Sequence, residues 1–285
     1  MNTFTSCLIC HHPDLVKMAE YERDYLCRCG KCGFVFSERI PTMEELVANY
    51  SNYPRSNKIS EITLKRYDEL LAYFERFRKT NNMIDVGAGD GYFIQRAKEK
   101  GWNAYATEFD DISVELCRQK GITTHKGKLE AKNYEAGMMD VIYSSEVIEH
   151  INNPVEEVRN FNAILRSGGV VYVTTPNFNS VSRKVLKSGW RIIEYPEHLC
   201  YYSSRTLGKL FKDNGFLIEQ IKTTGITPSI FFKQKTNAVH SHVSTEEIRE
   251  KTETKPLWNF IKNTLNAMLN TTKTGDTLKG KFVKK

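Results

Sequence analysis

The sequence predicts an α/β fold, in which a mostly parallel β-sheet carries helices on both faces and a small cysteine-rich module precedes it. Between residues 81 and 225, short β-rich runs alternate with helical segments, which is the order that gives parallel strands joined by helices. Five of the seven cysteines lie within residues 7–32, ahead of that alternation. The 285 residues suffice for one large α/β domain with a small appendage.

The individual elements follow from periodicity and from start and stop signals. Asn153 is expected to cap a helix whose first position is Pro154, where no amide donor is needed. Strands are expected over residues 83–86, 104–107, 141–143, 170–174 and 216–223. Helices are expected over residues 91–100, 112–120, 153 to about 167–169, and 204–214.

Four segments are predicted along the chain. Residues 1–40 form the cysteine-rich module, and residues 41–80 form a helical linker or cover that begins with a Thr42–Glu45 capping box. Residues 81–225 form the core. Residues 226–285 carry further helices, over 246–251 and 257–269, and a strand that starts near residue 275.

Composition excludes few partners. Hydrophobic residues make up 40% and charged residues 26% of the chain, as in globular proteins with a substantial core. No apolar run approaches the roughly 20 residues that span a bilayer, and the N-terminus lacks the features of a signal peptide, so we expect a cytoplasmic protein. The net charge of +7 is compatible with nucleic acid, an acidic substrate or a membrane surface as a partner, and it favours none of these over the others.

A glycine-rich turn follows the first strand of the core. Val86 leads into Gly87-Ala88-Gly89-Asp90-Gly91 and then into a helix. Glycines let the backbone approach a ligand closely, and the helix N-terminus adds free amides and partial positive charge. Nucleotide cofactors bind at such turns, at the carboxyl edge of the sheet.

The residues around this turn select the nucleotide. A dinucleotide fingerprint needs glycine at position 92, which is Tyr92. Asp85 and Asp90 disfavour a pyrophosphate but suit the sulfonium and ammonium of S-adenosylmethionine, and Asp85 is the expected partner of the ammonium. Glu108 lies 21 residues after Gly87, where a carboxylate accepts bonds from the ribose hydroxyls. The alternative, an ordinary glycine turn with a surface glutamate, fits this ordered set of features less well.

Over residues 60–225 the chain resembles the class I methyltransferase family, in particular the subgroup that includes quinone-biosynthesis, sugar and natural-product O-methyltransferases. The resemblance is carried by residues 84–93, 107–109, 140–150 and 165–169. It implies a Rossmann-like sheet of seven strands, whose last strand, resembled by residues 275–281, is antiparallel beside the fifth. Residues 226–274 would then be an insertion that could form a substrate lid.

The same resemblance extends the cofactor site. It implies that residues 127–130, and Leu129 among them, border the adenine ring, and that Phe109 and Ser145 also contact the cofactor. The full predicted cofactor set is Asp85, Gly87, Gly89, Gly91, Glu108, Phe109, Leu129 and Ser145.

Two histidines are candidates for the chemistry. His150 follows the fourth strand and His198 follows the fifth, so both are expected at the carboxyl edge of the sheet. A histidine with a pKa near 6.5 can remove the proton of an acceptor hydroxyl. For His150 a structural role fits the resemblance equally well, and His198 could position substrate or simply pack.

The cysteine spacing predicts a structural Zn²⁺ site, and so a zinc ribbon over residues 1–40. Cys7 and Cys10 form one Cys-x₂-Cys pair and Cys29 and Cys32 form the other, with 18 residues between the pairs. Cys27 offers a fifth thiol, but Cys29 has the spacing of a knuckle. Four cysteine ligands leave no open position for catalysis.

The sequence thus predicts methyl transfer from S-adenosylmethionine to a small-molecule acceptor, a sugar, sugar nucleotide, polysaccharide precursor or secondary metabolite. An RNA methyltransferase is the first alternative. Between Cys10 and Cys29, four acids stand against three bases, so the basic stripe that phosphate binding needs is missing. A scaffold protein that binds the cofactor without turnover is the second alternative.

Overall fold

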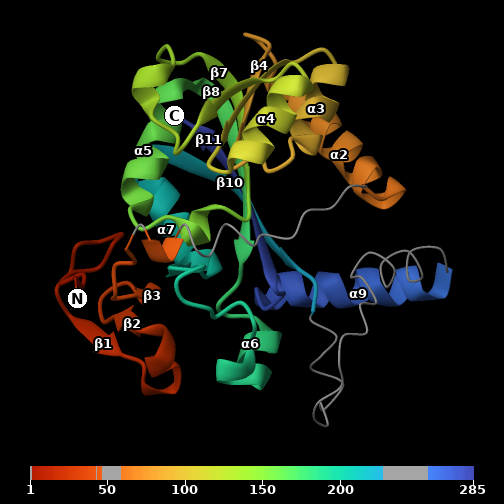
Figure 1. Ribbon diagram of the computed structural model, residues 1–285. Coiled ribbons are helices and arrows are strands. Elements are labelled where there is room, and N and C mark those ends of the chain that lie inside the picture. Colours follow the sequence, from red (N-terminus) through yellow and green to blue (C-terminus); the bar gives the residue numbers. More distant parts are fainter. Residues whose placement is uncertain (1, 43, 47–58, 227–255) are drawn as a thin grey trace.

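The computed structural model describes the chain outside residues 1, 43, 47–58 and 227–255 (Figure 1). The strands are β1 (Leu15–Lys17), β2 (Leu26–Cys29), β3 (Val35–Ser37), β4 (Asn82–Val86), β5 (Asn103–Glu108), β6 (Thr123–Lys126), β7 (Met139–Ser145), β8 (Leu165–Pro176), β9 (Cys200–Tyr201), β10 (Phe216–Thr224) and β11 (Thr277–Lys284). The α-helices are α2 (Glu61–Phe74), α3 (Tyr92–Glu99), α4 (Asp111–Gln119), α5 (Pro154–Ile164), α6 (Val181–Leu186), α7 (Ser204–Asp213) and α9 (Pro256–Thr272).

The central sheet confirms the predicted α/β architecture. Its seven strands lie in the order β10-β11-β8-β7-β4-β5-β6. The pairs from β8 through β6 are all parallel, whereas β11 is antiparallel to both β8 and β10. The strand that begins near residue 275 therefore lies beside the fifth core strand, as predicted. β6 was not predicted, because Thr123–Lys126 is short, polar and largely exposed.

Helices cover both faces of this sheet (Figure 1). On one face, apolar side chains of α2 and α3, such as Phe74 and Ile94, share one buried cluster with Met83 of β4. On the other face, α5 and α7 supply Phe161 and Phe211. β4 serves both sides, because successive side chains of a strand point to opposite faces. This sandwich fixes the carboxyl ends of β4, β5 and β7 at one edge.

The start of α5 was predicted correctly and its end was not. Asn153 caps the helix, with its side chain accepting from the Glu156 amide at 3.4 Å, and Pro154 occupies the first turn. The helix ends at Ile164, and β8 begins at Leu165 rather than after residue 169. Pairing of Leu165 with Met139 extends the strand backward, so tertiary pairing overrides the local glycine signal.

Around α2, the structure adds a cap that was not predicted. The Thr42–Glu45 capping box is confirmed, with reciprocal bonds of 2.9 and 3.2 Å. α2 begins separately, after Ser60, whose hydroxyl accepts from the Thr63 amide at 3.3 Å. The helix expected over residues 246–251 lies outside the described residues, and that over 257–269 falls within α9.

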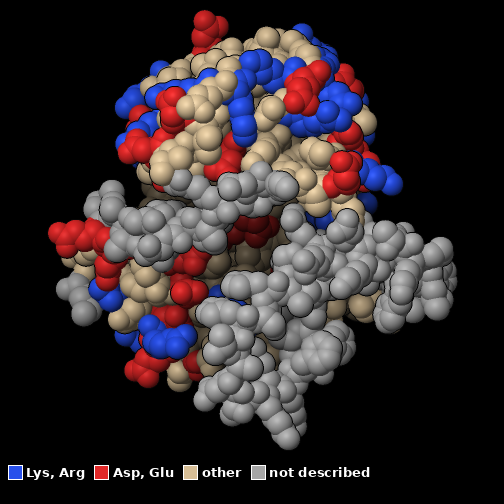
Figure 2. Space-filling model, turned by 45° about the vertical axis from the view of Figure 1, so that its right-hand side comes forward, with Lys and Arg blue, Asp and Glu red and all other residues tan. Residues whose placement is uncertain are grey.

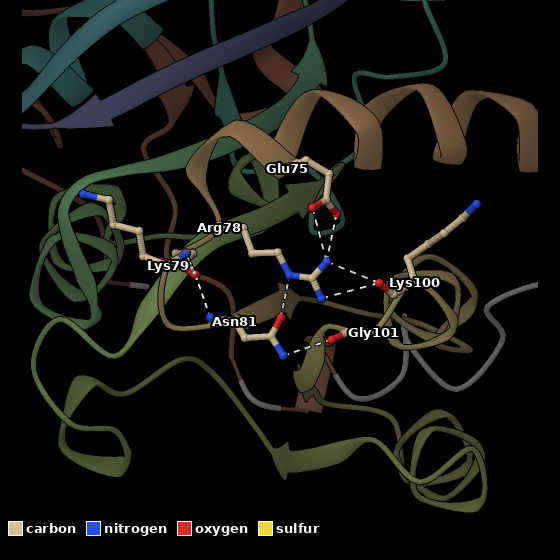
Figure 3. A network of polar contacts seen from close by, with 7 residues as sticks. Glu75, Arg78, Lys79, Asn81, Lys100 and Gly101 are labelled. Carbon is tan, nitrogen blue, oxygen red and sulfur yellow. Dashed lines mark hydrogen bonds and ion pairs between the residues drawn. The ribbon is translucent and has the colours of Figure 1, made fainter.

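A polar network fixes the opposite edge of the sheet, where β4 begins (Figure 3). The Arg78 guanidinium donates to Glu75 at 3.0 Å, to the Asn81 side chain at 2.5 Å and to the Lys100 carbonyl at 3.3 Å. Its cationic group also lies 4.5 Å from the centroid of the Trp102 ring. These contacts tie the end of α2 to the turn after α3, so they hold β4 in place at the end remote from the glycine turn.

The N-terminal residues form a second sheet, in the order β1-β2-β3-β9 (Figure 1). Its last strand, β9, belongs to the segment after the fifth core strand, and Phe36 pairs with Cys200. Buried Phe34 contacts Tyr202, with ring centroids 5.1 Å apart. The N-terminal module therefore shares a sheet and a hydrophobic core with the rest of the chain. Among the described residues, no helix combines the length and apolar character that a membrane span needs.

Glu157 on α5 makes stability depend on pH. Its side chain is buried, and this burial raises the pKa of the carboxyl to about 7. Between about pH 4.5 and 7 the folded chain keeps a proton that the unfolded chain has lost, so the free energy of unfolding should fall as pH rises, by about 3 kcal/mol. Glu157→Gln should remove this contribution and leave that of the other buried carboxyls, Asp85 and Glu149. Urea denaturation at pH 5 and pH 8 measures it, and equal pH slopes for the two proteins would contradict it.

Candidate functional site

The glycine turn after β4 is shaped by close neighbours. Gly87 has φ +71°, and a Cβ there would lie 2.4 Å from Cγ2 of Val147. Gly91 has φ +74°, and a Cβ would lie 2.6 Å from the Cys117 sulfur. At Gly89, with φ +52°, a Cβ would meet nothing within 4 Å. The turn is thus packed on two sides and open at Gly89, where a ligand can approach the backbone.

Glu108 ends β5 and is held against this turn. Its carboxylate accepts from the Gly89 amide at 2.8 Å. It also accepts from its neighbours, the amides of Phe109 at 2.6 Å and Asp110 at 3.1 Å. Three amides therefore fix the carboxylate at the open side of the turn, which is where a ribose would need an acceptor.

Asp85 lies directly below the turn and is 2% exposed. Burial, and then the Glu108 carboxylate, raise the pKa of Asp85 well above its usual value. The neighbouring carboxylates of Asp85 and Glu108 disfavour the binding of a ligand that brings further negative charge. A cofactor that carries a sulfonium and an ammonium would bring the positive charge that the pair lacks, so the residues present fit S-adenosylmethionine.

The other predicted cofactor residues lie at or after the ends of parallel strands. Phe109 follows β5 and is 54% exposed, whereas Leu129 follows β6 and is buried. Ser145 ends β7, and its hydroxyl lies 2.7 Å from that of Thr174. The strand order brings β5, β6 and β7 to the same edge as the glycine turn. Their contacts with a cofactor stay a prediction.

The structure brings His150 and His198 together, with ring centroids 4.7 Å apart. His150 ends a short 3-10 helix after β7, and His198 precedes β9. Nδ1 of His150 lies 2.6 Å from the Glu197 carbonyl, and Nδ1 of His198 lies 2.6 Å from that of Ile192. Burial, and then His198, lower the pKa of His150 to about 4. At neutral pH this imidazole is therefore uncharged.

Two glutamates near the histidines were not predicted as site residues. Glu149 is buried, and a carboxylate oxygen of it lies within 4.8 Å of a ring nitrogen of each histidine. Burial, and then Glu146, raise the pKa of Glu149 well above its usual value. Glu146, Glu149 and His150 occur at positions i, i+3 and i+4, and this spacing was the available signal. Figure 2 shows acidic side chains on the floor of a hollow in this face of the molecule.

The four predicted cysteine ligands lie together. The sulfurs of Cys7 and Cys32 are 3.5 Å apart, and those of Cys10 and Cys29 are 3.6 Å apart. Tetrahedral Zn²⁺ with Zn–S bonds of about 2.3 Å holds its sulfurs about 3.8 Å apart. Burial opposes ionisation, but the amides of Cys32 and Lys31 lower the pKa of Cys29 to about 7. Cys27 is not part of this group. The thiols therefore fit Zn²⁺.

Beside this cluster, the N-terminal module supports the segment that carries His198. The Ser37 amide donates to the Leu199 carbonyl at 2.8 Å. The Arg39 guanidinium lies 5.1 Å from the ring centroids of both Tyr25 and Tyr195. The module thus contacts the chain on both sides of His198. It pairs with β9, which follows His198, and it contacts Tyr195, which precedes it.

Comparison with known families and proteins agrees with this geometry. A family model described as "Methyltransferase domain" matches residues 59–221, more than half of the chain. A ubiquinone biosynthesis O-methyltransferase of Methylococcus capsulatus is 26% identical over 33% of this chain and 43% of its own length. A malonyl-[acyl-carrier protein] O-methyltransferase of Enterobacter lignolyticus is 22% identical over 53% of this chain and 60% of its own. The chain spans about half the length of these curated relatives.

Solved structures agree on the fold. The structure of a SAM-dependent methyltransferase from Archaeoglobus fulgidus superposes with a TM-score of 0.55 at 18% identity, over 85% of this chain and 100% of that one. An S-adenosylmethionine-dependent methyltransferase from Mesorhizobium loti gives a TM-score of 0.51 at 14% identity, over 76% of this chain and 100% of that one. At these identities the likeness concerns the fold.

Proposed function

The chain belongs to the methyltransferase-domain family, and on this premise we propose that it transfers a methyl group from S-adenosylmethionine to a hydroxyl of a small molecule. The observation that carries the proposal is the Glu108 carboxylate, held by the Gly89 amide at the open side of the glycine turn. There it would accept bonds from both ribose hydroxyls, while buried Asp85 would attract the ammonium of the cofactor.

The histidine pair would lie on the acceptor side of the cofactor. Val147, three residues before His150, would contact any side chain at Gly87, so the two segments are neighbours. In the reaction the acceptor oxygen forms a bond to the methyl carbon, and the carbon–sulfur bond breaks with its electron pair moving to sulfur. S-adenosylhomocysteine leaves, and the hydroxyl proton passes to a base or to solvent. His150 and His198 are the groups that would accept this proton or direct it to solvent.

A small hydroxyl acceptor is favoured over RNA. The curated relatives cited above are named as O-methyltransferases. In addition, Glu146 and Glu149 lie beside the histidines, and their carboxyl groups offer no positive charge to pair with a phosphate backbone. Neutral, hydroxyl-rich groups such as sugars suit such a site, because carboxylates accept hydrogen bonds from hydroxyls.

The four cysteines would bind a structural Zn²⁺. Their sulfur spacing supports this assignment, and the two turns that carry them are alike: the His11 amide donates to the Cys7 carbonyl and the Gly33 amide donates to the Cys29 carbonyl, each at 2.9 Å. When bound, the ion would tie the two turns together and stabilise the module against which the His198 segment rests.

The test is the formation of S-adenosylhomocysteine with a panel of sugars, sugar nucleotides, phenols and RNA. We expect turnover with a small hydroxyl acceptor and none with RNA. Glu108→Ala should abolish turnover by weakening cofactor binding, and Glu115→Ala, on the exposed side of α4, is the matched control. Turnover with RNA alone would overturn the choice of acceptor, and cofactor binding without turnover on any acceptor would support a scaffold role instead.

A further inference from the structure

We propose that one face of α4 holds the glycine turn after β4 in the shape that binds S-adenosylmethionine. This face, the α4 stripe, consists of Ser113 and Cys117 within the helix and Lys120, which caps its end. The three residues are spaced four and three positions apart, so their side chains lie on the same side of the helix. They are positioning residues, which act on the cofactor through the turn. The inference rests on the proposed function, because it concerns the binding of that cofactor.

Two consecutive carbonyl groups of the turn bond to the α4 stripe. The Cys117 thiol donates to the Gly89 carbonyl, with sulfur and oxygen 3.4 Å apart. The Lys120 ammonium donates to the Asp90 carbonyl. The Lys120 nitrogen also lies 4.0 Å from the centroid of the Tyr92 ring, in the first residue of α3. The stripe therefore contacts the turn and the start of the helix that follows it.

The side chain of Asp90 bonds to the same helix. One oxygen of its carboxylate accepts from the Ser113 hydroxyl at 3.3 Å, and Ser113 is buried. The sequence suggested Asp90 as a counter-charge for the cofactor, whereas the structure gives this oxygen a partner on α4. Because Ser113 and Cys117 are both buried, water competes little with their bonds to the turn. Asp90 is thus fixed through its side chain and through its carbonyl.

These bonds also set the direction of the amide between the two carbonyls. The peptide bond from Gly89 to Asp90 is trans, so its carbonyl and its amide point to opposite sides. The Asp90 amide therefore points away from Cys117. In the described part of the chain no acceptor bonds to this amide, which leaves it to a ligand or to water. The Gly89 amide, one residue earlier, donates to Glu108 at 2.8 Å. The turn would thus offer the Asp90 amide to an oxygen of the cofactor.

A turn of this composition needs such support. Three of its five residues, 87–91, are glycines, which allow the backbone many other conformations. When only a fraction of the molecules has the binding conformation, the apparent dissociation constant rises by the inverse of that fraction. The loss of one hydrogen bond that favours this conformation changes such an equilibrium about two- to tenfold. The α4 stripe would therefore affect cofactor affinity without touching the cofactor.

The experiment is isothermal titration calorimetry of the full, zinc-loaded chain with S-adenosylmethionine. Cys117→Ala and Lys120→Met should each raise the dissociation constant at least about threefold. Cys117→Ser keeps a donor at this position and should recover most of the affinity.

Two variants elsewhere in the fold are the matched controls. Cys200 is buried on β9 and donates to the Ile151 carbonyl at 3.2 Å, and Lys284 on β11 donates to the Asn162 carbonyl at 2.6 Å. Cys200→Ala and Lys284→Met should bind the cofactor as the wild type does. In urea denaturation, the free energy of unfolding should fall no further in Cys117→Ala and Lys120→Met than in these controls, which separates positioning of the turn from loss of the fold.

Cofactor affinities in Cys117→Ala and Lys120→Met that equal those of the controls would overturn the inference and leave the proposed function intact. Affinity in Cys117→Ser as weak as in Cys117→Ala would also overturn it. If Cys117→Ala does not fold, as judged by circular dichroism, Lys120→Met decides, because Lys120 is partly exposed. Conversely, the expected losses of affinity in a chain whose wild type methylates no acceptor would overturn the proposed function alone.

Discussion

Cys29→Ala should release zinc from the chain and lower methyl transfer at least about tenfold, which corresponds to about 1.4 kcal/mol of the activation barrier. Its sulfur lies 3.6 Å from that of Cys10, and Cys29 ends β2, next to the turn that leads to β3. Structural zinc sites supply about 10–16 kcal/mol of apparent binding free energy, so the module should not keep its structure without the ion.

The loss of activity follows from what the module supports. β3 pairs with β9, and Ser37 bonds to the carbonyl next to His198. When the module unfolds, the His198 segment loses this support, and the acceptor side of the site loses its geometry. Zinc content by atomic emission and turnover by S-adenosylhomocysteine formation measure the two effects. Cofactor affinity should change much less, because the glycine turn is on another part of the sheet edge.

Cys27→Ala is the matched control for this prediction. Cys27 is buried, as Cys29 is, and lies two residues away on the same strand, but it is not part of the cysteine cluster. Its replacement should cost some packing energy while leaving one zinc ion bound. Zinc loss in Cys27→Ala with retention in Cys29→Ala would show that the ligand set is wrong.

Gly89→Ala should weaken the binding of S-adenosylmethionine at least about tenfold, which corresponds to about 1.4 kcal/mol of binding free energy. A methyl group there meets no protein atom within 4 Å, so it would point into the space where the cofactor is expected. It would also stand beside the amide that donates to Glu108. Isothermal titration calorimetry with the cofactor measures the change in affinity.

Gly137→Ala is the matched control. It separates the effect of backbone strain from the effect of filling the space where the cofactor is expected. Gly137 also has a positive φ, +70°, and its nearest contact for a Cβ is Cα of Arg166 at 3.7 Å, an ordinary distance. Both variants should therefore pay a similar conformational cost of about 1–2 kcal/mol in stability. Only Gly89→Ala should bind the cofactor more weakly. Equal cofactor affinities in the two variants would show that the glycine turn is not part of the cofactor site.

Much of the fold could be predicted from the sequence, because local patterns carry it. The buried part of β8, residues 170–173, is a continuous apolar run, and Asn153 followed by Pro154 is a local signal for the start of a helix. The signals failed where tertiary pairing decides the outcome. β8 starts earlier than Gly168 and Gly169 suggest because Leu165 finds a partner in Met139. β6 has too little apolar character to be recognised before β5 pairs with it.

The candidate site divides in the same way. The sequence by itself determined the glycine turn, the carboxylate at Glu108 and the two cysteine pairs, because each depends on residue type at short spacing. Only the tertiary structure decided that His150 and His198 meet, that Glu149 is buried beside them, and that the N-terminal module shares its sheet with β9. These relations join residues far apart in the chain, and no local pattern encodes them, since they arise when packing brings separate strand ends to one edge of the sheet.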